Sequence, residues 1–399
     1  MEDRDRFFYG LSMAGALAIL SSTMSKNPIL PLFAQDLGAE GAALGLIAAA
    51  STIPGILVSL PAGSLSDRWG YRRVMYLSAL IFATAPFLYL FVDSPEALWA
   101  VRFYHGFATA IFGTVAKAAI VDAFPDQKAS RLTFYSSSTI VGRSAAPFVG
   151  GFLLVLTNYG YKDVYALIGV AGLSALLAIV MVYRRDGSGI GPRKVHAPLA
   201  SQLWSIVSQR RVLVASTVEA VQYFTFGAFE FFIVLYAAAA GIDLVLITLI
   251  TGSQLLTVIF VKPMLGRLAD RSGKERLIVA GLILGGVSVM LVPLTGNPAA
   301  LITLSIAFGT GFAAVTASTD ALVSDLCESS GSGSTMGFLN TLMDVGQAAG
   351  PIAVGAVIAT SLSYAGGFSL MALLLLVAMV LFAITFRGRR CGADAGRER

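Results

Sequence analysis

Two stretches of this 399-residue chain repeat one pattern: residues 63–73 read GSLSDRWGYRR, and residues 266–276 read GRLADRSGKER, 203 residues later. Two further motifs recur in the same order at spacings of 204 and 205, namely Gly142, Pro147 and Gly151 as Gly346, Pro351 and Gly355, and Gly106-Phe107-Ala108 as Gly311-Phe312-Ala313. A fixed internal period sets the architecture of a chain. The sequence therefore predicts two related halves of about 200 residues each.

The composition places the chain in a lipid bilayer. It is 56% hydrophobic and 13% charged, with a mean hydropathy of +0.77, whereas soluble proteins carry roughly a quarter charged residues. A membrane-spanning helix needs about 20 apolar residues, and the stretches are too long for barrel strands. Twelve stretches qualify and predict an all-α membrane protein: 8–32, 43–62, 74–92, 97–121, 131–155, 164–183, 212–237, 244–264, 277–295, 299–322, 334–360 and 363–386.

The basic residues are distributed unevenly between the loops. Of the 28 Lys and Arg residues, 22 lie in the termini and in alternate loops. This asymmetry predicts a multi-pass protein of the inner or plasma membrane with both termini in the cytoplasm. It also argues against nucleic acid as a partner, although the isoelectric point is near 9.2.

The doubled loop motif resembles the signature of the major facilitator superfamily, a family of secondary transporters, and the resemblance covers essentially the whole chain. It implies twelve helices in two pseudo-symmetric six-helix bundles that work by alternating access. The expected domains are a first bundle over 1–184, a cytoplasmic linker over 185–211, a second bundle over 212–387 and a cytoplasmic tail over 388–399. A short interfacial helix is expected at 201–209.

In the family, this loop closes the inner gate. The resemblance therefore implies a gating role for the matching residues of this chain: Gly63, Asp67, Arg68, Gly70 and Arg72, and Asp270 and Arg271 in the second copy. Glycine at 63 and 70 permits tight turns, and the Asp67 carboxylate can cap a helix or pair with a cation. The alternative is that the motif only fixes a turn and the topology.

Acidic residues gather in two spans of the second half. Glu219 and Glu230 share a helix face with Gln222 and Tyr223, and Asp344 shares one with Asn340 and Gln347. Burial in a low dielectric disfavours a charged carboxyl group, which suits reversible proton binding. Asp344, Glu219 and Glu230 are therefore the candidate proton carriers. The alternative is a carboxylate held in a static salt bridge.

The spans of the first half carry cations instead, namely Arg102, Lys117 and Arg143, with Lys26 near the outer end of the first span. The sequence from Arg102 to Gly106 resembles the helix 4 motif of the family, and Gly142–Gly151 resembles the helix 5 motif of drug–proton antiporters. The second motif departs from the pattern by its cation at 143 and by Ala146. His105 is expected to pack or to form a hydrogen bond, and a proton-shuttling role is the alternative.

Cations from one half and carboxylates from the other would form a polarised cavity for an anionic or zwitterionic organic solute. The candidate substrate-binding residues are Arg143, Arg102, Gln222, Tyr223, Asn340, Gln347 and Lys117. The alternative is that the arginines only neutralise the acids. Pro28, Pro31, Pro147 and Pro351 are expected to interrupt helices and to provide bending points.

These features predict a monomeric secondary active transporter for a small organic solute. Nucleotide-binding, hydrolase and metalloprotease motifs are absent, so we expect no enzyme and no cofactor, and we expect protons as the coupling ion. Proton-driven export, or antiport, is favoured by the antiporter-like motif around Pro147. Proton-coupled uptake, or symport, of an organic anion or zwitterion is the alternative, and a receptor or channel is a remote one.

Overall fold

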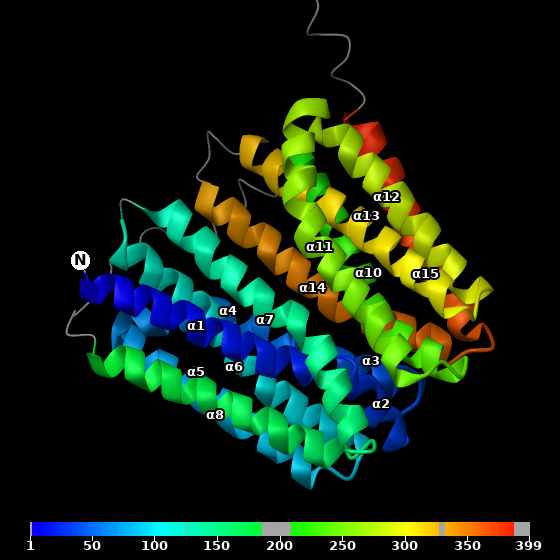
Figure 1. The fold of residues 1–399 in the computed structure, drawn as a ribbon. Coiled ribbons are helices and arrows are strands. Elements are labelled where there is room, and N and C mark those ends of the chain that lie inside the picture. Colours follow the sequence, from blue (N-terminus) through cyan, green and yellow to red (C-terminus); the bar gives the residue numbers. More distant parts are fainter. Residues whose placement is uncertain (1, 126, 186–208, 327–331, 387–399) are drawn as a thin grey trace, which may run out of the picture. The chain divides into compact units, whose positions relative to one another are not determined.

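The computed structural model describes residues 2–125, 127–185, 209–326 and 332–386, which fold into helices (Figure 1). The first half forms α1 (Glu2–Met24), α2 (Ile29–Asp36), α3 (Gly41–Ala49), α4 (Ile53–Trp69), α5 (Tyr71–Leu88), η1 (Tyr89–Phe91), α6 (Pro95–Ala123), α7 (Lys128–Leu156) and α8 (Tyr161–Arg185). The second half forms α10 (Arg210–Ala239), α11 (Leu244–Ser272), α12 (Lys274–Leu291), η2 (Val292–Leu294), α13 (Pro298–Leu326), α14 (Ser332–Ile358) and α15 (Ser363–Phe386).

Within these residues, twelve helical segments are long and apolar enough to cross a bilayer. The predicted all-helical membrane fold is therefore confirmed. In a bilayer, every backbone N–H and C=O group must find its partner inside the protein, which helices achieve within one segment. The described residues accordingly form helices and contain no strand.

The first two spans are each built from two helices. The first breaks between Met24 and Ile29, where Pro28 has no N–H to continue the ladder. The second breaks at residues 50–52, between α3 and α4. The interruptions expected at Pro147 and Pro351 are wrong, because α7 and α14 continue across both. Membrane helices tolerate proline where local adjustments satisfy the freed carbonyl groups.

The repeated loop motif has the same backbone geometry in both halves. Gly70 and Gly273 each lie between two helices with φ of +82° and +96°. A Cβ atom at either position would meet nothing within 4 Å, so glycine is required there by its backbone conformation and not by packing. The residue that follows makes an equivalent contact in each half. Tyr71 Oη donates to Asp122 Oδ2 at 2.6 Å, and Lys274 Nζ donates to Asp325 Oδ2 at 2.5 Å.

A second repeated contact brings two helices close together in each half. A Cβ atom at Gly142 of α7 would overlap the carbonyl oxygen of Ala16 in α1. A Cβ atom at Gly346 of α14 would overlap the carbonyl oxygen of Ala220 in α10 in the same way. Small residues allow this backbone approach in membrane helices, whose association depends on van der Waals packing.

The described residues separate into two compact units. One combines the residues up to 185 with Glu230–Gly252, and the other combines residues 209–229 with those from Ser253 onward. Glu230–Gly252 joins the first unit because Glu230 pairs with Lys26, and because a Cβ atom at Gly252 would overlap the Phe148 ring. The bundle boundaries drawn from the sequence remain a prediction.

Each unit has its own apolar core. In the first, α1 lies against α7 and α8, and α5 lies against α6 and α8, with Phe82 and Phe112 fully buried between them. In the second, α12 lies against α13 and α15, and its core includes Leu282, Val315 and Leu375. These cores fix the helices from which the polar side chains project.

Several expectations concern residues outside the described ranges. The linker is described only at its ends, and the predicted helix at 201–209 is described only at Gln209. The tail 388–399 also lies outside. The surroundings of Gly63 and Asp67 in α4 are likewise not among the described features.

Candidate functional site

One carboxyl group of α10 is completely enclosed in the second unit. Glu219 has 0% of its surface exposed, and neither carboxyl oxygen has a hydrogen-bond partner among the described residues. A buried carboxylate without a partner costs several kcal/mol. This position therefore suits a neutral carboxylic acid, or a carboxylate beside a cation.

An ion pair lies on the neighbouring helices. Lys262 Nζ of α11 is 3.3 Å from Asp320 Oδ2 of α13, and the two side chains are 36% and 38% exposed. Pairs with this exposure contribute about 0–1 kcal/mol to stability. The charges of Asp320 and Lys262 are both close enough to Glu219 to influence the ionisation of its carboxyl group. We call Glu219, Lys262 and Asp320 the carboxylate cluster.

The helix register explains why these residues lie at one level. The Phe226 and Phe312 rings of α10 and α13 are 4.4 Å apart, and those of Phe229 and Phe308 are also 4.4 Å apart. The two helices are thus antiparallel at these contacts. From the Phe226–Phe312 contact, two turns toward the start of α10 lead to Glu219, and two turns toward the end of α13 lead to Asp320. Glu219 and Asp320 therefore lie at about the same level.

Two amides of the second unit are also buried. Gln222 of α10 and Gln254 of α11 are fully buried, and their amide atoms have no hydrogen-bond partner among the described residues. Gln222 Nε2 would lie 3.9 Å from a Cβ atom at Gly285 of α12. Buried polar groups are usually hydrogen-bonded, so the unsatisfied amide of Gln222, one turn from Glu219, marks this part of α10 as more than packing.

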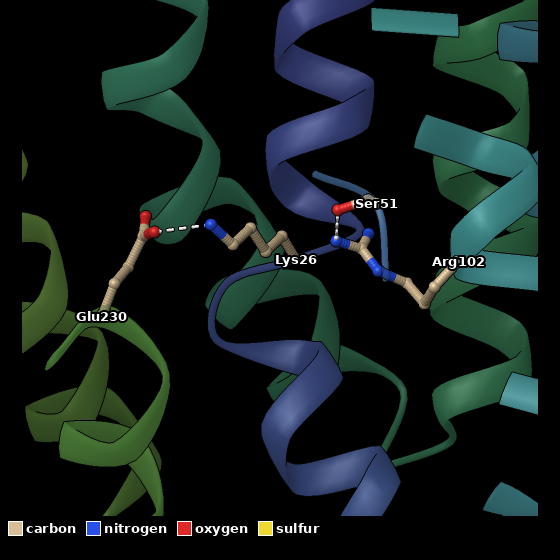
Figure 2. Close-up of polar contacts among 4 residues, drawn as sticks. All are labelled: Lys26, Ser51, Arg102 and Glu230. Atoms are coloured by element: carbon tan, nitrogen blue, oxygen red, sulfur yellow. Dashed lines mark hydrogen bonds and ion pairs between the residues drawn. The ribbon is translucent and has the colours of Figure 1, made fainter. Parts of the chain in front are cut away.

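The first unit holds a buried cation instead. Arg102 of α6 is 2% exposed, and its Nη2 donates to Ser51 Oγ at 2.6 Å (Figure 2). Arg102 Nε has no partner among the described residues. Ser51 is within reach because the chain breaks between α3 and α4, and because Gly106 lets α6 contact the Ser51 backbone.

Aromatic side chains surround this arginine. The Tyr89 and Tyr165 rings stack with their centroids 4.0 Å apart, and Tyr165 Oη donates to the Ser25 carbonyl at 3.0 Å. The positive charge of Arg102 lies close to the Tyr89 hydroxyl group. His105 is buried with Nδ1 3.4 Å from Tyr89 Oη, which agrees with its expected packing role. We call Arg102, Ser51, Tyr89, His105 and Tyr165 the arginine cluster.

A second ion pair joins Lys26, after α1, to Glu230 of α10. Lys26 Nζ donates to Glu230 Oε2 at 2.7 Å, and the side chains are 20% and 7% exposed (Figure 2). Glu230 was a candidate proton carrier on sequence grounds. In this structure its carboxylate is engaged by an ammonium group, which corresponds to the static alternative.

The other predicted polar residues are more dispersed. Arg143, Lys117 and Asn340 are exposed, and Asp344 is half-buried on α14. Tyr223 is half-buried, and its ring contacts the Phe312 ring edge-on at 5.1 Å. Gln347 is half-buried and lies against Gly227. Their assignment to substrate binding or proton binding stays a prediction.

Four charged residues of the loop motif are exposed, namely Arg68, Arg72, Asp270 and Arg271. Arg72 Nε donates to Tyr76 Oη at 3.2 Å, one turn farther along α5. Exposed charges at helix ends can change partners at low cost. Their gating role stays a prediction.

Sequence reasoning missed Asp320, Lys262 and Ser51 as site residues. A signal existed for Asp320, because it follows Lys117 by 203 residues, the spacing of the loop motif. The same position thus carries a cation in the first half and an acid in the second. Nothing in the sequence pointed to Ser51.

A groove among the described residues lies elsewhere. Its volume is about 930 Å³, and its lining on α12 and α15 includes Leu282, Val287, Leu373 and Leu376. It contains none of the residues of the two clusters. Its apolar lining on two strongly hydrophobic spans matches a lipid-facing surface.

Comparisons with known proteins agree on one family. The model of the Major Facilitator Superfamily matches residues 11–249 and 215–394. The multi-drug resistance efflux pump PmrA homolog of Lactococcus lactis is 26% identical, over 94% of this chain and 94% of that protein. The quinolone resistance protein NorA of Staphylococcus aureus is 24% identical, over 53% of each chain.

A solved structure has the same fold. A bacterial homolog of the human lysosomal transporter Spinster, in an inward-facing and unoccupied conformation, matches with a TM-score of 0.79 at 13% identity. The match covers 96% of this chain and 97% of the other. At this identity the likeness concerns the fold alone.

Proposed function

The chain belongs to the Major Facilitator Superfamily and is a transporter, not an enzyme, and from this premise we propose that it exports a small organic solute in exchange for protons. The observation that carries the proton coupling is Glu219, a carboxyl group enclosed without a hydrogen-bond partner. Such a group can take up and release a proton at modest cost when its surroundings change.

Export is supported by the relatives. The PmrA homolog is named as a multidrug efflux pump, and NorA as a quinolone resistance protein. The first name states efflux of drugs, and the second states resistance to an organic solute. We extend that direction of transport to this chain.

In the proposed cycle, Glu219 carries the proton, with Asp344 as a second candidate. Solute contacts come from Gln222, Tyr223, Asn340 and Gln347 of the second half, and from Arg102, Arg143 and Lys117 of the first. The two copies of the loop motif, with Asp67 and Asp270, act as the inner gate. The protein works as a monomer with both termini in the cytoplasm.

Uptake of an organic anion with protons is the second candidate function. The observation that favours it is Arg102, a buried guanidinium that donates to the neutral Ser51 hydroxyl and keeps one N–H without a partner. A guanidinium binds a carboxylate through two parallel hydrogen bonds. A solute carboxylate could therefore satisfy the arginine.

The test is proton movement in proteoliposomes that contain a pH-sensitive dye. The vesicles are exposed under a set pH gradient to an organic anion, a zwitterionic fluoroquinolone or a cationic dye such as ethidium. Protons that move against the solute establish export by antiport, and protons that move with it establish symport.

The matched controls are Glu219→Gln and Glu96→Gln. Glu96 lies exposed at the start of α6, so its substitution should leave proton movement unchanged. Glu219→Gln should abolish it. Wild-type vesicles that move no protons with any of the three solutes would overturn the proposal, as would full proton movement in Glu219→Gln.

A further inference from the structure

The carboxylate cluster contains two acids and one base. Lys262 is the cation that acts on Glu219, and it is also paired with Asp320. With both acids ionised, the cluster has one negative charge too many for its single ammonium group. One proton removes the excess, so the question is which acid holds it.

The two acids differ sharply in their access to water. Asp320 is 38% exposed as a side chain and can be hydrated when it is ionised and unpaired. Glu219 has no exposed surface and no hydrogen-bond partner among the described residues, so its ionised form needs a cation close by. The proton therefore belongs on Glu219 while Lys262 is engaged by Asp320.

Lys262 is suited to change partners. Its distance to Asp320 is 3.3 Å, longer than the 2.7 Å of the enclosed Lys26–Glu230 pair. Its side chain keeps 36% exposure and a flexible four-carbon stem. Rotation about the bonds of such a stem moves the ammonium group between neighbouring partners.

The helices packed against α10 differ in the charged groups that they carry. The 24 residues of α15 carry no charge. On α14, the Gly346–Ala220 contact brings Asp344 close to the level of Glu219, and Asp344 has interactions of its own. Lys274 is engaged by Asp325 at the start of α12. Lys262 is thus the cation placed to replace a proton on Glu219.

We infer that Lys262 is a positioning residue shared by two carboxyl groups, Glu219 and Asp320. This role rests on the proposed proton-coupled function. With Glu219 protonated, Lys262 pairs with Asp320. When Glu219 releases its proton to water, the Lys262 ammonium moves to the new Glu219 carboxylate, and Asp320 remains as a hydrated carboxylate. The cluster then carries one proton per cycle, and its charge falls by one as that proton leaves.

The experiment measures the protonated form of Glu219 directly and needs no solute. Dicyclohexylcarbodiimide reacts with protonated carboxyl groups in apolar surroundings. The full-length protein in phosphatidylcholine vesicles is labelled across a series of pH values, and the modified Glu219 peptide is quantified by mass spectrometry. The variants are Lys262→Gln, Lys262→Arg and Asp320→Asn, with Lys274→Gln as the matched control from a second ion pair, Lys274–Asp325.

The two partners should have opposite effects. In mildly alkaline buffer, Lys262→Gln should raise Glu219 labelling about tenfold, because the ionised form has lost its cation. Asp320→Asn should lower labelling about tenfold, because Lys262 is then free for Glu219. Lys262→Arg and Lys274→Gln should stay within about twofold of the wild type. Circular dichroism and gel filtration confirm that each variant is folded.

The inference is overturned if Lys262→Gln and Asp320→Asn leave labelling unchanged, or if both shift it in the same direction. It is also overturned if Lys274→Gln shifts it as much as Lys262→Gln. Coupled proton movement in the vesicles with unchanged labelling would keep the proposed function and remove the role of Lys262. The predicted labelling pattern without proton movement would keep the charge sharing and remove the proposed function.

Discussion

The arginine cluster and the carboxylate cluster bury charge in opposite ways. A guanidinium carries a fixed charge, and that of Arg102 is stabilised by neutral hydrogen-bond partners such as Ser51. Glu219 has no such partner among the described residues, but it can gain or lose a proton. The first unit thus holds a fixed charge, which can bind an anionic group. The second unit holds a carboxyl group whose charge depends on whether it carries a proton.

One close helix contact is repeated in the two halves. The Gly142–Ala16 contact of α7 and α1 recurs as the Gly346–Ala220 contact of α14 and α10. Backbone approach was therefore retained in both halves, while the polar side chains diverged. Position 117 carries lysine where position 320 carries aspartate.

The largest expected effect separates the variable charge from the fixed one. Glu219→Gln should lower proton-driven transport about 100-fold and remove its pH dependence. Arg102→Gln should lower the transport rate by the same factor at every pH, because a guanidinium group does not change its charge in this range. Initial rates in proteoliposomes across a pH series measure both. A pH-dependent loss in Arg102→Gln would break the comparison.

The next effect tests the shared scaffold. Gly142→Val and Gly346→Val should each lower the free energy of unfolding by about 2 kcal/mol, because the added carbons meet backbone and not a movable side chain. Unfolding in mixed micelles followed by circular dichroism gives the values.

The controls are Gly113→Val and Gly266→Val, where a Cβ atom would meet nothing within 4 Å. They should cost under about 1 kcal/mol. Equal losses at all four glycines would show that the close contacts are not what the glycines serve.

A smaller effect concerns the Lys26–Glu230 pair. Lys26→Met should cost about 1–2 kcal/mol of stability, because Glu230 is 7% exposed and would lose its cation. The double variant Lys26→Met with Glu230→Met should recover most of that loss. Chemical unfolding of the single and double variants completes the cycle. A double variant less stable than Lys26→Met would contradict the expectation.

The smallest effect compares the repeated loop contact. Tyr71→Phe should cost about 1 kcal/mol, because the lost hydrogen bond to Asp122 is partly buried. Lys274→Met should cost only a few tenths of a kcal/mol, because Asp325 is 59% exposed and water replaces its partner. The same unfolding experiment resolves the difference. A larger loss for Lys274→Met would mean that burial does not decide the strength of this contact.

The sequence sufficed for the architecture because two strong signals agreed, the internal period and the twelve apolar stretches. It identified Glu219 because a carboxyl group in an apolar helix is conspicuous. It did not identify Asp320, which lies six residues from the end of α13 and looks like a boundary residue. The pairing of Lys26 with Glu230 depends on which helix ends meet, and spacing along a chain carries no information about that.

The helix α10 runs unbroken from Arg210 to Ala239, through both units. Glu219 and Glu230 therefore sit on one rod, about 16 Å apart along its axis. A stiff rod transmits displacement: a shift or rotation that moves Glu219 by about 1 Å also moves Glu230 by a comparable amount. A 2.7 Å ion pair has little slack before it exceeds hydrogen-bonding distance. Along α10, a displacement at the position of Glu219 is thus transmitted to the residue that Lys26 binds.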